Sequence, residues 1–90
     1  MKSRATRRFW YFYEQLPTSI QQLANKNYRL WLKNPRHPSL LFKKLHGRGD
    51  RFSVRIGHNY RAIGHFVTNG VEWVWVGSHE EYDLLLRPRS

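Results

Sequence analysis

The chain has 90 residues, the size of one small domain, and its 16 lysines and arginines against 6 acidic residues give a net charge of +10. It contains no cysteine, which excludes a disulfide framework or a cysteine-based zinc site and fits a reducing cytoplasm. The length predicts a single domain over residues 1–90. No apolar run approaches the roughly 20 residues of a membrane-spanning helix, so we expect a cytoplasmic location and no membrane partner. The charge predicts attraction to polyanions such as nucleic acid or an acidic protein.

Two amphipathic helices are predicted in the first third of the chain. The first begins at Arg7 and ends at Pro17, and its apolar residues have the helical spacing i, i+3, i+4, i+7: Phe9, Phe12, Tyr13 and Leu16. The second opens at Thr18 or Ser19, each of which has a glutamine three residues later and so predicts a capping box, and it closes at Asn34-Pro35. The short link between the two predicts an αα-hairpin.

Residues 34–49 are rich in proline and glycine and are predicted to form a loop. Basic residues gather at the end of this segment and just beyond it. They form a phosphate-steering patch if the chain binds RNA, and otherwise they belong to a solvated loop. The candidate RNA-binding residues are Lys43, Lys44, Arg48 and Arg51.

Residues 52–66 have the pattern of a β-hairpin, because apolar and polar residues alternate on both sides of Gly57-His58-Asn59. A three-residue loop sets Ile56 opposite Tyr60 and Arg55 opposite Arg61. It also gathers one apolar face: Phe52, Val54, Ile56, Tyr60, Ala62 and Phe66. A two-residue loop would place Arg61 among the apolar residues, so the first register is preferred. Two arginines placed opposite each other repel, which indicates that they are either solvated or hold an anion.

The last third predicts a central strand and a short helix. After a turn at Thr68-Asn69-Gly70, the strand Val71–Gly77 is apolar on nearly both faces. The helix Glu80–Leu86 follows, with Ser78 and Glu81 as its capping box. The fold class is therefore α+β, with two N-terminal helices packed on one face of a small antiparallel sheet and a short C-terminal helix. The sequence leaves open whether a short strand precedes the first helix. The sheet face that carries the two arginines is expected to stay partly exposed.

At this point the chain resembles the RelE/ParE toxin superfamily of bacterial toxin–antitoxin systems. The likeness covers about residues 5–86 and is carried by the paired helices and by three segments: LFKKLHG, VRIGHNYRAIG and WVGSHEEYDLLL. It implies a small α+β toxin that is neutralised by a cognate antitoxin. RelE-like members cut mRNA on the ribosome without a metal or other cofactor, by attack of the substrate's 2′-hydroxyl on the adjacent phosphate.

The resemblance also implies site residues. Arg55 and Arg61 fall on phosphate-facing positions of the hairpin, His79 near a basic position after the last strand, and Tyr82 near a C-terminal tyrosine. Ser53 stands where many active members carry a second basic residue. The expected roles are charge stabilisation for the arginines, acid–base work for His79, and orientation or proton donation for Tyr82.

Two alternatives remain open beside the endoribonuclease. A ParE-like inhibitor of DNA gyrase would share the fold, and a degenerate toxin would only bind an antitoxin or RNA. The remaining histidines are assigned to the surface or loops, because no carboxylate joins them at a metal-binding spacing: His37, His46, His58 and His65. The pair Trp73 and Trp75 is assigned to the core, with base stacking as the alternative.

Overall fold

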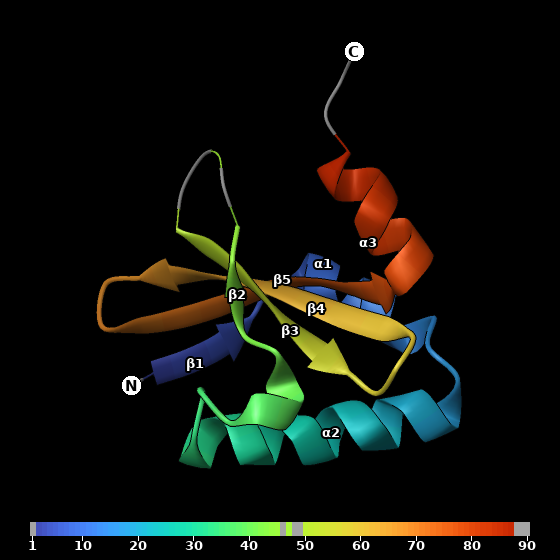
Figure 1. Cartoon of the computed structure of the whole chain (residues 1–90), viewed down its shortest axis with the longest axis horizontal. Coiled ribbons are helices and arrows are strands. Elements are labelled where there is room, and N and C mark those ends of the chain that lie inside the picture. Colours follow the sequence, from blue (N-terminus) through green and yellow to red (C-terminus); the bar gives the residue numbers. More distant parts are fainter. Residues whose placement is uncertain (1, 46, 48–49, 88–90) are drawn as a thin grey trace.

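The computed structural model describes residues 2–45, 47 and 50–87, which form a five-stranded sheet and three α-helices (Figure 1). The elements are β1 (Lys2–Ala5), α1 (Arg7–Glu14), α2 (Thr18–Lys33), the 3₁₀ helix η1 (Pro38–Leu40), β2 (Lys43–Lys44), β3 (Arg51–Ile56), β4 (Tyr60–Val67), β5 (Gly70–Ser78) and α3 (His79–Leu86). Across the sheet the strands run β1-β5-β4-β3-β2. The α+β class and its helices are as predicted.

The sheet is mixed rather than purely antiparallel, because the leading strand β1 pairs parallel to β5. Gly70 permits this pairing, since a Cβ atom at that position would lie 2.1 Å from the carbonyl oxygen of Lys2. The segment predicted as a loop also contains structure. It holds η1, which buries Leu40 completely, and β2, which pairs antiparallel with β3 at the sheet edge.

The two N-terminal helices pack on the same core, as expected. The predicted stripe of α1 faces inward, and Thr6 caps the helix by accepting a hydrogen bond from the Phe9 amide at 3.1 Å. The capping box predicted for α2 is wrong, because Pro17 is the N-cap and no side chain caps the helix. The Gln21 side chain instead donates to the Tyr13 carbonyl at 3.0 Å and so satisfies the end of α1.

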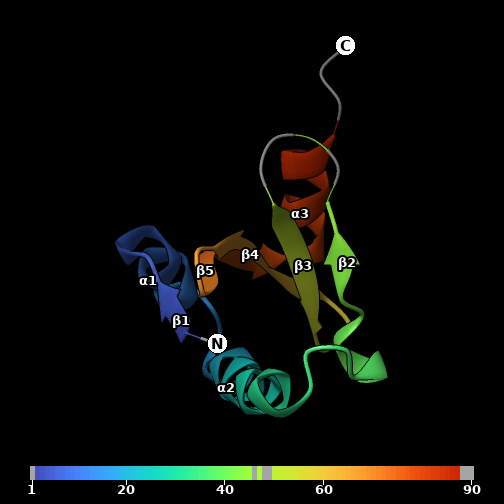
Figure 2. The same ribbon diagram turned by 90° about the vertical axis from the view of Figure 1, so that its left-hand side faces the viewer.

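The β3–β4 hairpin has the predicted register, with Ile56 opposite Tyr60 and Arg55 opposite Arg61. Its loop is Gly57-His58-Asn59, and Gly57 takes a φ of +62°, which glycine adopts most readily. The apolar face of the hairpin packs against α2, which lies below the sheet in Figure 2, whereas α3 lies on the opposite side of the sheet. The face that carries the arginines is therefore covered in its middle by α3, more than the sequence indicates.

A β-bulge in β5 divides the aromatic core into two. Ile63 pairs with Trp75 and the next residue, Gly64, pairs with Trp73, so Val74 is the extra residue. Trp73 consequently packs with the helical layer, while Trp75 packs on the other face with Ile63 and Tyr82. Both tryptophans are core residues, as assigned, with exposed fractions of 6 % and 9 %.

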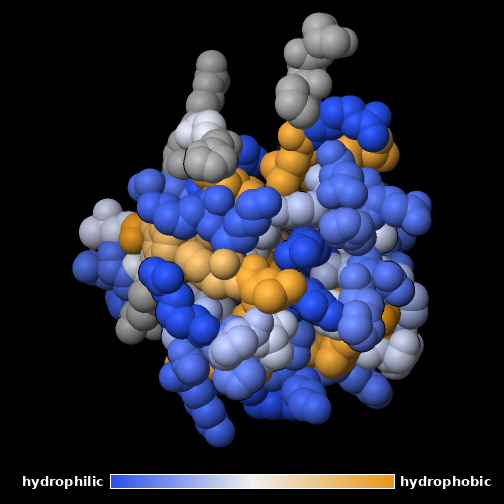
Figure 3. All heavy atoms as spheres, viewed as in Figure 1, coloured by the Kyte–Doolittle hydropathy of each residue, from blue (hydrophilic) through white to orange (hydrophobic). Residues whose placement is uncertain are grey.

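The predicted capping box of α3 is confirmed. Ser78 Oγ accepts from the Glu81 amide at 3.1 Å, and the Glu81 carboxylate accepts from the Ser78 amide at 3.0 Å. The helix nevertheless leaves Leu84 and Leu85 on the surface, and apolar atoms on α3 stand out in the space-filling view (Figure 3). Tyr82 and Leu86 pack the other side of the helix against Ile63 and Trp75 of the sheet.

Candidate functional site

Arg55 and Arg61 lie directly opposite each other on neighbouring strands, at the end of the sheet where α3 begins. In that geometry their Cα atoms are about 5 Å apart, so their side chains leave the same face together. Neither arginine joins an ion pair with a carboxylate among residues 2–45, 47 and 50–87. Their contacts are instead with a backbone carbonyl, an imidazole ring and a phenol ring.

Arg55 is held by the hairpin loop. Its Nε donates to the Gly57 carbonyl at 2.5 Å, and its Nη2 lies 2.7 Å from Nδ1 of His58. The backbone beneath it is also fixed, because the Asn27 amide of α2 donates to the Arg55 carbonyl at 3.1 Å. Asn27 lies on the side of α2 that faces the hairpin, and this contact gives its polar side chain a partner.

Arg61 is held by an aromatic ring. Its guanidinium carbon lies 5.3 Å from the centre of the Tyr82 ring, a cation–π contact. Tyr82 is 6 % exposed, and its hydroxyl donates to Oγ of Ser53 at 3.0 Å. Ser53 is completely buried, so the position where a second basic residue was expected lies under α3 and supports the tyrosine.

His79 completes the group at the first residue of α3. Its backbone amide donates to the Asn59 carbonyl at 2.6 Å, which fastens the helix to the hairpin loop. Its ring stacks on Tyr82 with centres 6.2 Å apart, and its Nε2 lies 3.3 Å from Asp83, one turn later. The structure thus brings together the four predicted site residues, Arg55, Arg61, His79 and Tyr82.

The predicted RNA-binding residues do not form one patch. Lys43 pairs with Ser53 and shares its face, whereas Lys44 pairs with Phe52 and belongs to the opposite face. Arg51 shares the face of Arg55 but lies four residues away, about 13 Å along the strand. Arg48 lies outside the described residues, as does His46.

A second charged group lies at the far end of the same face. Glu72 accepts from Arg4 Nε at 2.8 Å and lies 2.9 Å from His65 Nε2, so it joins β1 to β4. The hydrogen bond with His65, followed by the contact with Arg4, holds the pKa of the Glu72 carboxyl below its usual value of 4.5. We interpret this group as structural. Within the described residues no three histidine or acidic side chains gather as metal ligands would.

A family model described as the ParE-like toxin domain matches residues 18–83, which include α2, the hairpin, β5 and most of α3. The chain belongs to this toxin family. A search of curated proteins found no match. In the described part of the toxin, no helix combines the length and apolar character needed to cross a bilayer.

Solved toxin structures share the fold. The YoeB/ParE toxin from Agrobacterium tumefaciens superposes with a TM-score of 0.69 at 20 % identity, covering 88 % of this chain and 99 % of that one. RelE in the RelE–RelB complex from Pyrococcus horikoshii gives 0.68 at 16 % identity, covering 86 % and 92 %. The isolated RelE toxin of E. coli gives 0.66 at 19 % identity, covering 92 % of each chain. Such low identities establish the fold of the toxin and not its target.

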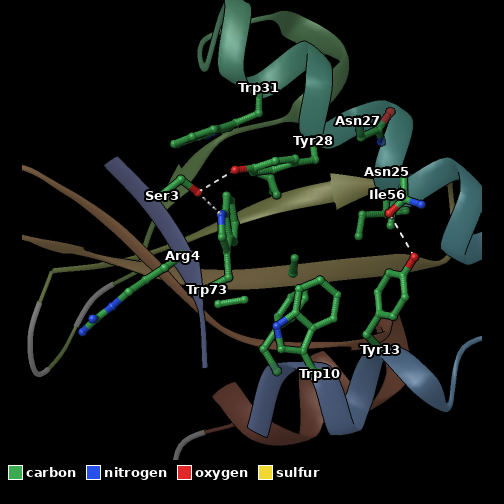
Figure 4. Close-up of a pocket in the computed structure, with 15 residues that line it drawn as sticks. Ser3, Arg4, Trp10, Tyr13, Asn25, Asn27, Tyr28, Trp31, Ile56 and Trp73 are labelled. Carbon is green, nitrogen blue, oxygen red and sulfur yellow. Dashed lines mark hydrogen bonds between the residues drawn. The ribbon is translucent and has the colours of Figure 1, made fainter. Parts of the chain in front are cut away.

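A groove between α1 and α2 is a further feature, which sequence reasoning missed. It has a volume of about 220 Å³ and lies over the sheet face opposite the arginines (Figure 4). Six of its fifteen lining residues are aromatic: Phe9, Trp10, Tyr13, Tyr28, Trp31 and Trp73. At its edge, Ser3 of β1 accepts hydrogen bonds from the Tyr28 hydroxyl and the Trp73 indole at 2.9 and 3.1 Å (Figure 4). The signal in the sequence was a tryptophan, Trp10, outside the predicted apolar stripe of the first helix, and in the structure about half of its surface is exposed.

Proposed function

We propose that this toxin is an endoribonuclease that cuts mRNA on the ribosome, acting in the cytoplasm and neutralised by a cognate antitoxin. The observation that carries the proposal is the pair Arg55 and Arg61, opposite each other and without a carboxylate partner among the described residues. Two adjacent guanidinium groups suit a phosphate, because each offers donors in a planar fork and keeps its charge at any physiological pH.

The arrangement supports a metal-independent cleavage step. The substrate's 2′-oxygen attacks the adjacent phosphorus, the bond to the 5′-oxygen breaks, and the products are a 2′,3′-cyclic phosphate and a 5′-hydroxyl. Arg55 and Arg61 stabilise the charge that develops on the phosphate oxygens. His79 accepts the 2′-hydroxyl proton through Nδ1, since its Nε2 faces Asp83, and water supplies the proton to the leaving oxygen.

Of the two roles expected for Tyr82, orientation of its neighbours and proton donation, we assign it the first. Its hydroxyl already donates to the buried Ser53, so it is a poor source of a proton for the leaving group. Its ring, between Arg61 and His79, sets the direction of both side chains. This support is the contribution of α3 to the proposed site.

The antitoxin is the partner we assign to the aromatic groove. The RelE toxins of Pyrococcus horikoshii and Methanococcus jannaschii were each solved as a complex with RelB. Here the helices that line the groove are strongly basic, because Glu14 is the only acidic residue before Asp50. An amphipathic antitoxin segment would place its apolar side in the groove and acidic residues against the basic rim.

Replacing Arg61 with alanine tests the nuclease. Wild type, Arg61→Ala and the matched control Arg29→Ala, an exposed arginine of α2, are expressed under control in bacteria, and mRNA 5′ ends are mapped. We expect new cuts within translated codons for wild type and Arg29→Ala. Loss of one preorganised charge contact should lower cleavage by Arg61→Ala by roughly 10²-fold.

Gyrase inhibition is the second candidate, favoured by the ParE-like description of the family and by a serine where a second basic residue was expected. Growth arrest without new mRNA ends would overturn the nuclease proposal and point to this target. The double variant Arg55→Ala/Arg61→Ala separates the two, because it should abolish a nuclease and spare a gyrase inhibitor. The absence of any growth arrest would instead indicate a degenerate binding module.

A further inference from the structure

We propose that His58 is a positioning residue of the phosphate site, whose Nδ1 holds the guanidinium of Arg55 in place opposite Arg61. The inference rests on the proposed function, because it assigns a task within the same site. Sequence reasoning places His58 among the loop histidines, and the family resemblance gave it no role. The ring is exposed, yet it lies 2.7 Å from Arg55 Nη2.

The donors of Arg55 divide into two groups. A guanidinium carries one N–H on Nε and two on each Nη. The Nε–H points to the Gly57 carbonyl and one Nη2–H to His58, so both contacts are on the side of the hairpin loop. Among residues 2–45, 47 and 50–87, nothing accepts from the two N–H groups of Nη1 or from the second one of Nη2, and these lie on an edge that can bind two phosphate oxygens at once. The loop therefore fixes the arginine without consuming its phosphate-binding edge.

Such an anchor is needed because Arg55 and Arg61 repel each other. A long side chain facing a like charge would rotate into solvent, where it gains conformational entropy and loses the repulsion. Arg61 is restrained by the Tyr82 ring, whereas the side chain of Arg55, within the described part of the chain, is held by the two loop contacts. Removal of His58 should leave Arg55 attached through Nε alone and free to turn its outer nitrogens.

The loop that carries His58 is itself well fixed. Gly57 takes a left-handed conformation, and a Cβ atom there would lie 2.8 Å from the Leu23 side chain, so α2 packs against the turn. On the other side, Asn59 accepts the amide hydrogen bond of His79 at 2.6 Å. His58 therefore stands between two anchored residues and gives Arg55 a fixed acceptor.

His58 can accept the hydrogen bond from Arg55 Nη2 only if its Nδ1 carries no proton. Variants can therefore be chosen by whether they place an acceptor at the position of Nδ1. Asparagine places its Oδ1 near the position of Nδ1, whereas glutamine reaches toward the position of Nε2. His58→Asn should therefore retain the contact, and His58→Gln and His58→Ala should lose it. His58 is exposed, so all three variants should fold, which circular dichroism checks.

Steady-state cleavage of ribosome-bound mRNA gives the first readout. We expect kcat to fall about tenfold in His58→Ala and His58→Gln, with KM unchanged because the ribosome presents the substrate, and to recover in His58→Asn. Wild-type kcat in His58→Ala would overturn the proposal. An equal loss in His58→Ala and His58→Asn would also overturn it, because the asparagine supplies the acceptor.

A second readout does not depend on cleavage. The Nε–H resonance of Arg55 is followed by NMR during titration with inorganic phosphate, and the tautomer of His58 is read from its ring nitrogens. We expect Nε2–H as the tautomer, and a phosphate dissociation constant several-fold weaker in His58→Ala but not in His58→Asn. If purified toxin cuts no RNA, the proposed function fails, and this titration alone decides the role of His58.

Discussion

Tyr82 joins the buried interior to the surface of the proposed site. Its hydroxyl donates a hydrogen bond to Ser53 and its ring makes the cation–π contact with Arg61, so one side chain has two separable tasks. The two tasks differ in what they need: the hydrogen bond requires the hydroxyl, whereas the cation–π contact requires only the ring. Single substitutions can therefore distinguish stability from function at this position.

Tyr82→Phe should lower the free energy of unfolding by about 1–3 kcal/mol, because the completely buried Ser53 hydroxyl then has no partner. The double variant Ser53→Ala/Tyr82→Phe should recover most of that loss, since neither polar group remains. Denaturant unfolding of wild type, Tyr82→Phe, Ser53→Ala and the double variant measures this double-mutant cycle. Cleavage should survive in Tyr82→Phe and not in Tyr82→Ala; loss of cleavage in Tyr82→Phe at unchanged stability would restore the proton-donor role.

Glu72 should make part of the stability depend on pH. Its pKa is lowered in the folded state, chiefly by the hydrogen bond with His65, so its contribution is present above the usual value of 4.5 and disappears as the pH falls through the lower folded value. The stability difference between wild type and Glu72→Gln should accordingly shrink as the pH falls below about 4.5. Urea unfolding across that range measures it, and a pH-independent difference would contradict the assignment.

At the scale of elements, the sequence predicted those whose signal is local. Periodicity placed α1 and α2, alternation gave the hairpin register, and the Ser78–Glu81 spacing gave the cap of α3. The rest depends on tertiary contacts: β1 has no apolar alternation and is a strand because β5 is beside it, and β2 is only two residues long. The bulge at Val74 follows from packing on both faces of β5, which a run of apolar residues does not reveal.

Gly70→Ala tests how β1 is attached. The new Cβ would meet the Lys2 carbonyl, so the strand must shift, and overpacking of this kind costs about 1–3 kcal/mol of unfolding free energy. The amide of Thr6, which donates to the Trp73 carbonyl at 3.0 Å, should then exchange faster with solvent. Thr68→Ala, an exposed change in the same turn, is the control. Unchanged exchange at Thr6 would mean that β1 tolerates the methyl group.

At the scale of the whole molecule, charge is unevenly distributed. Half of the six acidic residues lie on α3, namely Glu80, Glu81 and Asp83, while the first 49 residues hold Glu14 alone. The layer of α1 and α2 is thus predominantly positive, which suits an acidic partner on that face. The same excess of charge should weaken the isolated fold through self-repulsion.

Salt should therefore stabilise the free toxin. Raising ionic strength from about 0.05 to about 0.5 M shortens the screening length to a few ångströms, and the melting temperature should rise by a few degrees. The rise should be smaller in Lys26→Glu/Arg29→Glu, which lowers the net charge on an exposed face of α2. A melting temperature that falls with salt would show that favourable ion pairs outweigh the repulsion.

The bulge in β5 has one practical consequence, which concerns fluorescence. Because it turns Trp73 toward the groove and Trp75 toward Tyr82, one strand carries an indole reporter for each face of the sheet. Replacing the other tryptophans with phenylalanine would leave either indole as the sole long-wavelength emitter. The emission of Trp73 would then record occupation of the groove, and that of Trp75 would record events beside the arginines, without any added dye.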